Sequence, residues 1–170
     1  MNLITLLVGV PGSGKSTYIN HCIDENERGR GAWIDGGASA VQVCSADHWF
    51  MRSGEYRFNP AELGVAHGKC LRKFVECLQS RAADWLVLDN TNTTTNELAP
   101  YVALAQAYDV KYEIVHLECP VEVAASRNVH GVPLKSIERM DENIKRMLAH
   151  FPPYWNKPII VPFSSFGQVE

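Results

Sequence analysis

The stretch Gly9-Val10-Pro11-Gly12-Ser13-Gly14-Lys15-Ser16 decides the fold, because it matches the P-loop pattern Gly-x-x-x-x-Gly-Lys-Ser. It follows the apolar run 3–8, which predicts a buried strand, and it precedes residues 17–23, whose spacing predicts a helix. In this context glycines let backbone N–H groups approach phosphate oxygens, and the helix adds its positive dipole end. The residues expected to hold a nucleoside triphosphate such as ATP are Gly12, Ser13, Gly14, Lys15, Ser16 and Thr17.

Two side chains of this region and one acid further along predict the charge chemistry of the site. Lys15 is expected to place a positive charge on the outer phosphates, and the Ser16 hydroxyl is expected to bind Mg²⁺. Asp89 ends the apolar run 85–88, as an acid that completes a Mg²⁺ shell does. An acid in that place can also be an ordinary cap or turn residue at the end of a strand.

The composition is that of an ordinary globular domain. The 170 residues are 46% hydrophobic and 21% charged, which predicts one domain over residues 1–170. No apolar run approaches the roughly 20 residues of a membrane span, and no signal peptide is recognisable. The five cysteines include no Cys-x-x-Cys pair, so free thiols and a cytoplasmic location are expected. The net charge of −3 argues against tight, sequence-independent binding to duplex nucleic acid.

Apolar runs alternate with helical patterns along the chain. Such alternation predicts an α/β fold of three layers, in which a parallel sheet is covered by helices on both faces. The expected strands are 3–8, 40–44, 85–88, 111–117 and a last one near 159–161. The expected helices are 17–23, 59–81, 95–108, 120–128 and 134–148, with Leu134 among the inward-facing residues of the last.

Local signals mark where helices begin and where loops lie. Asn59 with Pro60 and Glu62 predicts a capped helix start, and the segment Thr94-Thr95-Asn96-Glu97 resembles a capping box. Residues 52–58 are expected to form a loop, and the polar, glycine-rich residues 24–39 an exposed connection.

Two residues outside the P-loop are candidates for catalysis. Asp47 follows the second strand and can accept the proton of an attacking hydroxyl, although it can equally cap the next segment. Arg127 precedes a chain break, where P-loop kinases close a lid that brings arginine onto the phosphates; the alternative is a surface arginine. The lid is expected over about 121–150 and a C-terminal tail over 151–170.

Basic and aromatic residues are interleaved before and within the helix that begins near Asn59. Arg52, Lys69 and Arg72 are candidates for contacting a nucleic-acid backbone, and the aromatic residues for stacking on a base. An ordinary solvated helix with buried loop aromatics explains the same pattern.

Several strings resemble the polynucleotide-kinase-like P-loop family, which includes phage 5′-polynucleotide kinases and the kinase half of polynucleotide kinase/phosphatase. Besides the P-loop they are Cys44-Ser45-Ala46-Asp47, Tyr56-Arg57-Phe58-Asn59-Pro60, Ala66-His67, Leu88-Asp89-Asn90-Thr91-Asn92-Thr93, Pro100-Tyr101-Val102 with Leu104-Ala105, and Arg127-Asn128-Val129-His130-Gly131-Val132-Pro133. The likeness covers about residues 3–150. It implies a kinase-type P-loop NTPase with a helical lid, in which Asp47 is the general base toward a 5′-hydroxyl and Arg127 belongs to the lid. It also implies that Lys15 and Ser16 hold ATP with Mg²⁺, and that Asn90 and Asn92 shape the acceptor or metal side.

The chain also differs from the phage enzymes of that family. They carry an arginine three residues past the catalytic aspartate, where this chain has Phe50, and Arg52 is the candidate substitute. A further lid arginine of theirs falls near His130. Despite these differences, the resemblance predicts an ATP-dependent 5′-polynucleotide kinase acting on DNA or RNA ends. The alternatives are a kinase for a nucleoside or small alcohol and a non-catalytic ATP-binding module, and the sequence leaves the oligomeric state open.

Overall fold

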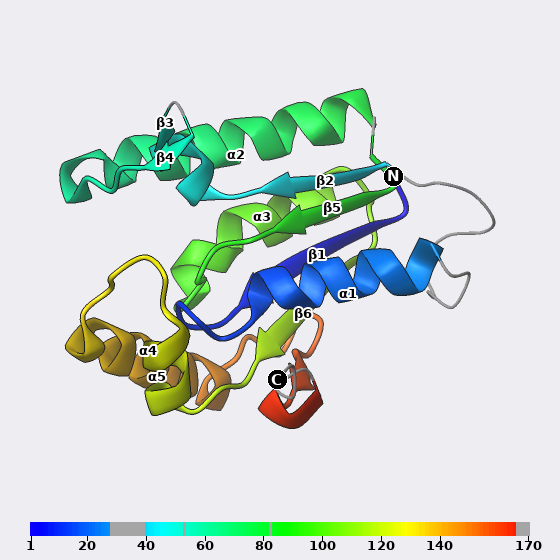
Figure 1. Cartoon of the computed structure of the whole chain (residues 1–170). Coiled ribbons are helices and arrows are strands. Elements are labelled where there is room, and N and C mark those ends of the chain that lie inside the picture. The colour runs from blue at the N-terminus through cyan, green and yellow to red at the C-terminus, as the bar shows by residue number, and fades with distance from the viewer. Residues whose placement is uncertain (28–39, 53, 82, 166–170) are drawn as a thin grey trace.

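The fold is built on a parallel sheet, seen here in a computed structural model that describes residues 1–27, 40–52, 54–81 and 83–165. Within these residues the sheet has five strands in the order β2-β5-β1-β6-β7 (Figure 1). The strands are β1 (Leu3–Val8), β2 (Val41–Cys44), β5 (Trp85–Leu88), β6 (Tyr112–Leu117) and β7 (Ile159–Val161). β1, which leads into the P-loop, lies between β5 and β6. The predicted parallel sheet and its last strand are confirmed.

Helices connect the strands. They are α1 (Lys15–Glu27), α2 (Leu63–Ser80), α3 (Thr95–Ala107), α4 (Val121–Arg127) and α5 (Leu134–Ala149). Short 3₁₀ helices lie at η1 (Ala46–Phe50), η2 (Pro60–Glu62) and η3 (Phe163–Ser165), and a small hairpin joins β3 (Met51–Arg52) to β4 (Glu55–Tyr56). Figure 1 shows the hairpin and the α4–α5 pair at the end of the sheet toward which the strand arrows point.

The two faces of the sheet bury two separate apolar clusters, because successive side chains of a strand point to opposite sides. Ile4 and Leu6 pack in the cluster that includes side chains from α2, α3 and α5, whereas Leu3 and Leu7 pack with Ile19 of α1. In Figure 1, α1 accordingly lies in front of the sheet and α3 behind it. This arrangement is the predicted α/β architecture with helices on both faces.

Three side chains of the sheet are linked by hydrogen bonds. Trp85 donates from its indole nitrogen to the Thr5 hydroxyl, and Thr5 donates to a carboxylate oxygen of Glu113, both at 2.8 Å. Thr5 and Glu113 are register partners of β1 and β6, so the sheet itself brings them together. Burial raises the pKa of Glu113, and the hydrogen bond from Thr5 opposes that shift.

The predicted helix starts are largely confirmed. The Asn59 side chain accepts from the Ala61 backbone at 3.1 Å, but the chain first makes the 3₁₀ turn η2, and the α-helix begins at Leu63. Thr94 and Glu97 form the expected capping box of α3. The helix continues through Pro100, which lies inside it.

Other local predictions need correction. The loop expected over 52–58 contains the β3–β4 hairpin, because Met51 pairs with Tyr56 across a turn that includes Gly54 at φ +82°. Leu134 is half exposed rather than inward-facing. Residues 24–27 of the expected connection belong to α1, and residues 28–39 lie outside the described part.

All five cysteines are free of disulfide bonds, as expected. Among the described residues, none of the helices combines the length and apolar character required to cross a membrane.

Candidate functional site

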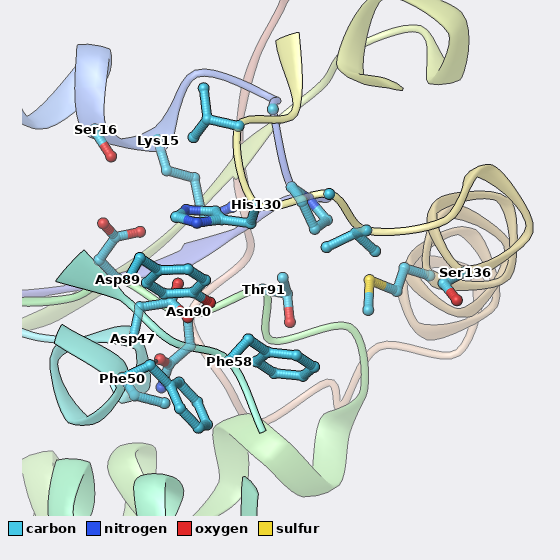
Figure 2. A pocket seen from close by; sticks show the side chains of 18 of the residues that line it. Lys15, Ser16, Asp47, Phe50, Phe58, Asp89, Asn90, Thr91, His130 and Ser136 are labelled. Carbon is cyan, nitrogen blue, oxygen red and sulfur yellow. Dashed lines mark hydrogen bonds between the residues drawn. The ribbon is translucent and has the colours of Figure 1, made fainter. Parts of the chain in front are cut away.

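A cavity of about 1020 Å³ lies where the carboxyl ends of β1, β2 and β5 meet. Parallel α/β sheets bind their ligands at this edge. In the view of Figure 2, Lys15 and Ser16 border the cavity above Asp89, and Phe50 and Phe58 border it below. The cavity is lined by the P-loop, η1, the start of α2, the segment after β5 and the expected lid. Its lining residues include Gly12, Gly14, Thr17, Asp47, Tyr56, His67, Asn90, Arg127, His130, Pro133 and Met140.

The P-loop takes its shape from two glycines at positive φ. Gly12 has φ +81°, and its α-carbon lies so close to the Ala124 carbonyl of α4 that any side chain would overlap that oxygen. Gly14 has φ +96° and open space around it. Ser13 does not line the cavity: its backbone donates to the Val10 carbonyl at 3.1 Å, and its side chain is buried. The loop is thus packed against α4, which carries Arg127.

Lys15 is the central cation of the cavity. Its ammonium donates to the backbone carbonyls of Gly9 at 3.0 Å and Val10 at 3.1 Å. Burial lowers the pKa of Lys15, and the nearby carboxylates of Asp89 and Asp47 oppose this shift. Two carboxylates therefore act on one lysine in a space that a phosphate chain can enter.

Ser16 and Asp89 are the predicted Mg²⁺ ligands, and both line the cavity. The Asp89 backbone donates to the Cys44 carbonyl at 2.8 Å, which fixes the end of β5 against β2. Burial raises the pKa of Asp89, while the Lys15 charge opposes the shift. A hydroxyl and a carboxylate are hard oxygen donors, so these side chains fit the ion.

Asp47 lies in the first turn of η1, directly after β2. Ser45 caps this turn by accepting from the Asp47 backbone at 3.2 Å. The Asp47 side chain is exposed in the cavity, and its Oδ1 accepts a hydrogen bond from the Tyr56 hydroxyl at 2.8 Å. A carboxylate placed here can take a proton from a hydroxyl that approaches from the cavity.

Asn90 and Asn92 have different surroundings. Asn90 lines the cavity and accepts from the Ala46 backbone at 2.9 Å, which ties η1 to the end of β5. Asn92 is buried at φ +45° and donates to the Leu7 carbonyl at 2.7 Å, away from the lining. The structure therefore gives Asn92 a contact that holds the backbone of β1.

The expected lid contributes Arg127 and His130 to the lining. The Arg127 guanidinium lies 4.8 Å from the ring centre of Phe163 in η3, a cation–π contact. The His130 ring lies 4.4 Å from that of Tyr56, centre to centre. The expected lid thus contacts both the C-terminal segment and the β3–β4 hairpin.

Two of the three basic residues expected to contact substrate, Lys69 and Arg72, lie outside the lining of the cavity. The Lys69 ammonium lies 5.8 Å from the ring centre of Trp49, and Arg72 is exposed; neither residue lines the cavity. Arg52 belongs to β3 by its backbone, and its side chain lies outside the described part.

Sequence reasoning misses several lining residues. Tyr56 and Phe58 belong to a family-like string and to the aromatic residues expected to stack on a base, but nothing in the sequence pairs Tyr56 with Asp47. His67 belongs to the family-like pair Ala66-His67, and Met140 belongs to the apolar stripe of its helix, but neither signal places the residue in the cavity. Their helices bring them to the cavity, which local patterns do not reveal.

Comparison with known proteins places this geometry in a wider group. A family profile described as an AAA domain (AAA_33) matches residues 4–154. Human NEDD4-binding protein 2 is 31% identical over 99% of this chain and 9% of its own length. The bifunctional polynucleotide phosphatase/kinase of Schizosaccharomyces pombe is 25% identical over 74% of this chain and 24% of its own length. The chain thus spans only a small part of these curated relatives.

Solved structures share the fold at low sequence identity. A chain of the Pnkp1/Rnl/Hen1 RNA repair complex superimposes with a TM-score of 0.66 at 18% identity, over 89% of this chain and 46% of that one. The crystal structure of APE1195 gives 0.59 at 16% identity, over 96% of this chain and 87% of that one. At such identities the likeness establishes the P-loop α/β fold alone.

Proposed function

Since the chain belongs to the AAA domain family (AAA_33) and is related to polynucleotide kinases, we propose that it transfers the γ-phosphate of ATP to a polynucleotide 5′-hydroxyl. One observation carries the proposal. Lys15, Asp47 and Asp89 line one cavity, which the P-loop and the expected lid share, and both carboxylates favour the charged form of the Lys15 ammonium. Phosphoryl transfer requires a cation on the phosphates, an oxygen donor for the metal and a base on the acceptor side, within one space.

On the donor side, the backbone of residues 12–17 would hold the phosphates, and Lys15 would turn from its loop carbonyls to the outer phosphate oxygens. Ser16 and Asp89 would hold Mg²⁺, which when bound neutralises charge on the phosphate chain. Arg127 would stabilise the charge that spreads over the transferring group. It comes from α4, whose Ala124 carbonyl packs on Gly12, so the lid arginine and the P-loop share one support.

On the acceptor side, the attacking hydroxyl would give its proton to the Asp47 carboxylate as its oxygen forms a bond to the γ-phosphorus. The bond between that phosphorus and the β–γ bridging oxygen breaks, and ADP leaves with the bonding electrons. A 5′-polynucleotide end is the proposed acceptor, because the Ser-Ala-Asp and Asp-Asn-Thr-Asn strings resemble those of polynucleotide kinases. The name of the Schizosaccharomyces pombe relative supports the same choice.

A specific observation favours a second acceptor class, a nucleoside or small alcohol. Phe50 occupies the place of a phosphate-contacting arginine in phage enzymes, and Lys69 and Arg72 do not line the cavity. The wall beside Asp47 is largely aromatic and apolar, with Phe58, Leu63 and Pro60 among its residues. Such a wall suits a base or sugar better than it suits a phosphate.

The test supplies γ-labelled ATP with a 5′-hydroxyl DNA oligonucleotide, a 5′-hydroxyl RNA oligonucleotide and a nucleoside panel in parallel. We expect labelled oligonucleotide, abolished or strongly reduced by Asp47→Asn, while ATP binding stays close to wild type. Asp109→Asn is the matched control, since Asp109 is an exposed acid that does not line the cavity. Label in the nucleosides alone selects the second class. ATP binding without transfer to any acceptor would refute both and leave a non-catalytic nucleotide-binding module.

A further inference from the structure

Tyr56 is hydrogen-bonded to the side chain on which the proposed chemistry depends. Its hydroxyl donates to Oδ1 of Asp47 at 2.8 Å, although the two residues lie on different elements, β4 and η1. Its ring lies 4.4 Å from that of His130 in the lid and packs edge-on against Phe50 at 6.1 Å. Tyr56 therefore joins the carboxylate, the hairpin and the lid in one group of contacts.

We propose that Tyr56 is a positioning residue for phosphoryl transfer: it holds Asp47 by one carboxylate oxygen so that the other is presented to the acceptor hydroxyl. The inference rests on the proposed function, and it adds a residue that no motif of the sequence assigns to the reaction. Tyr56 acts through Asp47.

The need for such a residue follows from the exposure of Asp47. An exposed carboxylate on a short 3₁₀ turn rotates freely about its last side-chain bond, and each misaligned rotamer lowers the fraction of productive encounters. A hydrogen bond to the charged carboxylate restricts that rotation and is stronger than one between neutral groups. The phenol can stay a donor at neutral pH, since burial and the bond to Asp47 raise the pKa of Tyr56 above its ordinary value.

The hairpin holds the phenol in place. Tyr56 pairs with Met51 across the β3–β4 ladder, and the Arg57 backbone donates to the Phe50 carbonyl at 2.8 Å. Phe50 is fully buried, so the hairpin is anchored in the core immediately after the turn that carries Asp47. The turn and the hairpin therefore share one anchor, which fixes the phenol relative to the carboxylate.

Contact with His130 connects the same group to the lid. Because its ring packs on Tyr56, the expected lid contacts the residue whose hydroxyl is bonded to the carboxylate, and Arg127 of the same segment lines the same cavity. Tyr56 thereby contacts the expected lid with its ring and orients the base with its hydroxyl. Removing only the hydroxyl separates the two contributions.

Tyr56→Phe keeps the ring contacts and removes the donor. We expect kcat with the preferred acceptor to fall about tenfold or more, the range expected for losing a hydrogen bond to a charged group, while the KM for ATP stays within about twofold. Tyr154→Phe, at an exposed tyrosine outside the lining, is the matched control and should match wild type. If Tyr56 had only a structural role, the substitution would lower the amount of folded protein, and kcat per folded molecule would not fall at an unchanged KM for ATP. Unchanged or increased kcat would overturn the inference, an increase meaning that the phenol blocks the base.

A second measurement does not depend on turnover. Protein labelled with 3-fluorotyrosine gives a fluorine resonance for each of its six tyrosines, and Tyr56→Phe identifies the one of interest. Asp47→Asn should shift that resonance and leave the Tyr154 resonance in place. If it does not move, the contact is absent in solution and the inference is wrong. Failure of the proposed function looks different: wild type transfers no phosphate, although the resonance still reports the contact. An active wild type with a fully active Tyr56→Phe variant refutes this inference alone.

Discussion

Substitution of Gly12 by alanine tests whether the P-loop is packed against α4, the first helix of the expected lid. Gly12 has φ +81°, and a methyl group there would overlap the Ala124 carbonyl oxygen, which belongs to the backbone and cannot rotate away. Gly54 in the β3–β4 turn has nearly the same conformation, φ +82°, but among the described residues beyond its chain neighbours no atom lies within 4 Å of the place its methyl would take. Gly54→Ala therefore carries the conformational cost without the overlap.

The magnitudes follow from these two environments. Placing a non-glycine residue in the left-handed region costs about 1–2 kcal/mol, and this cost applies to both variants. The gain from a stiffer unfolded chain also applies to both and cancels in the comparison. Overlap with packed backbone adds about 1–3 kcal/mol to Gly12→Ala alone. The free energy of unfolding should thus fall by about 1–2 kcal/mol for Gly54→Ala and by about 2–5 kcal/mol for Gly12→Ala.

Urea unfolding, followed by circular dichroism, measures both variants against wild type. A lower midpoint with an unchanged slope assigns the loss to the folded state. ATP binding should also weaken in Gly12→Ala beyond any effect in Gly54→Ala, because relief of the overlap moves the loop or α4. Equal losses of stability in the two variants would refute the packing of the P-loop on α4.

Three further predictions concern the core and the lid. Glu113→Gln should raise the free energy of unfolding by less than about 1 kcal/mol at neutral pH, discounted because the side chain keeps some contact with water. Burial raises the pKa of Glu113 in the folded protein. The stability that the protonated side chain contributes is therefore present below the pKa of the unfolded chain, and it is lost as the pH rises through the pKa of the folded protein. The advantage of the variant, which can still accept from Thr5, should vanish in acid, and a pH series of urea melts checks this. Asn92→Ala leaves a buried β1 carbonyl without its donor and should cost about 1–3 kcal/mol with an unchanged KM for the acceptor; a selective rise in KM would instead restore its predicted substrate role. Phe163→Leu removes the ring that contacts Arg127 and should lower kcat a few-fold, which is consistent with a partly exposed cation–π contact. The midpoint of urea unfolding should not change. Equal kcat values for the variant and wild type would show that the contact does not position the guanidinium.

What could be predicted from the sequence is what strand ends and local caps determine. Lys15 and Asp89 follow apolar runs, and the carboxyl ends of parallel strands meet at one edge, so their meeting in the cavity follows from the pattern. Asp47 was placed by the same reasoning. The capping box at Thr94 and the cap at Asn59 depend on residues three or fewer positions apart, which the sequence displays directly.

The remainder depends on contacts that no local pattern encodes. The hydrogen bond between Tyr56 and Asp47 requires a hairpin whose strands are two residues long, too short for an alternation of apolar and polar residues to be recognised. Lys69 precedes Cys70, a core position of α2, and a helix turns about 100° per residue, so the lysine is carried off the buried face to Trp49. The sequence shows that basic residues are present on the helix, but it does not show which way their side chains point.

Apart from Asp47 and Arg127, which the sequence also predicts, the division between predictable and unpredictable residues follows a division in the site. Asp89 is fixed to β2 through the Cys44 carbonyl, and η1 is fixed to the end of β5 through Asn90, so these groups are anchored to the central sheet. Apart from Asp47, which η1 carries, the groups that would meet the acceptor come from the hairpin and the expected lid, whose contacts with each other are ring contacts between exposed or half-exposed side chains. Rigid anchoring suits the donor, whose phosphates are the same in every cycle. Contacts of that weaker kind can adapt, so differences in acceptor among relatives should arise in the hairpin and lid while the donor side stays as it is.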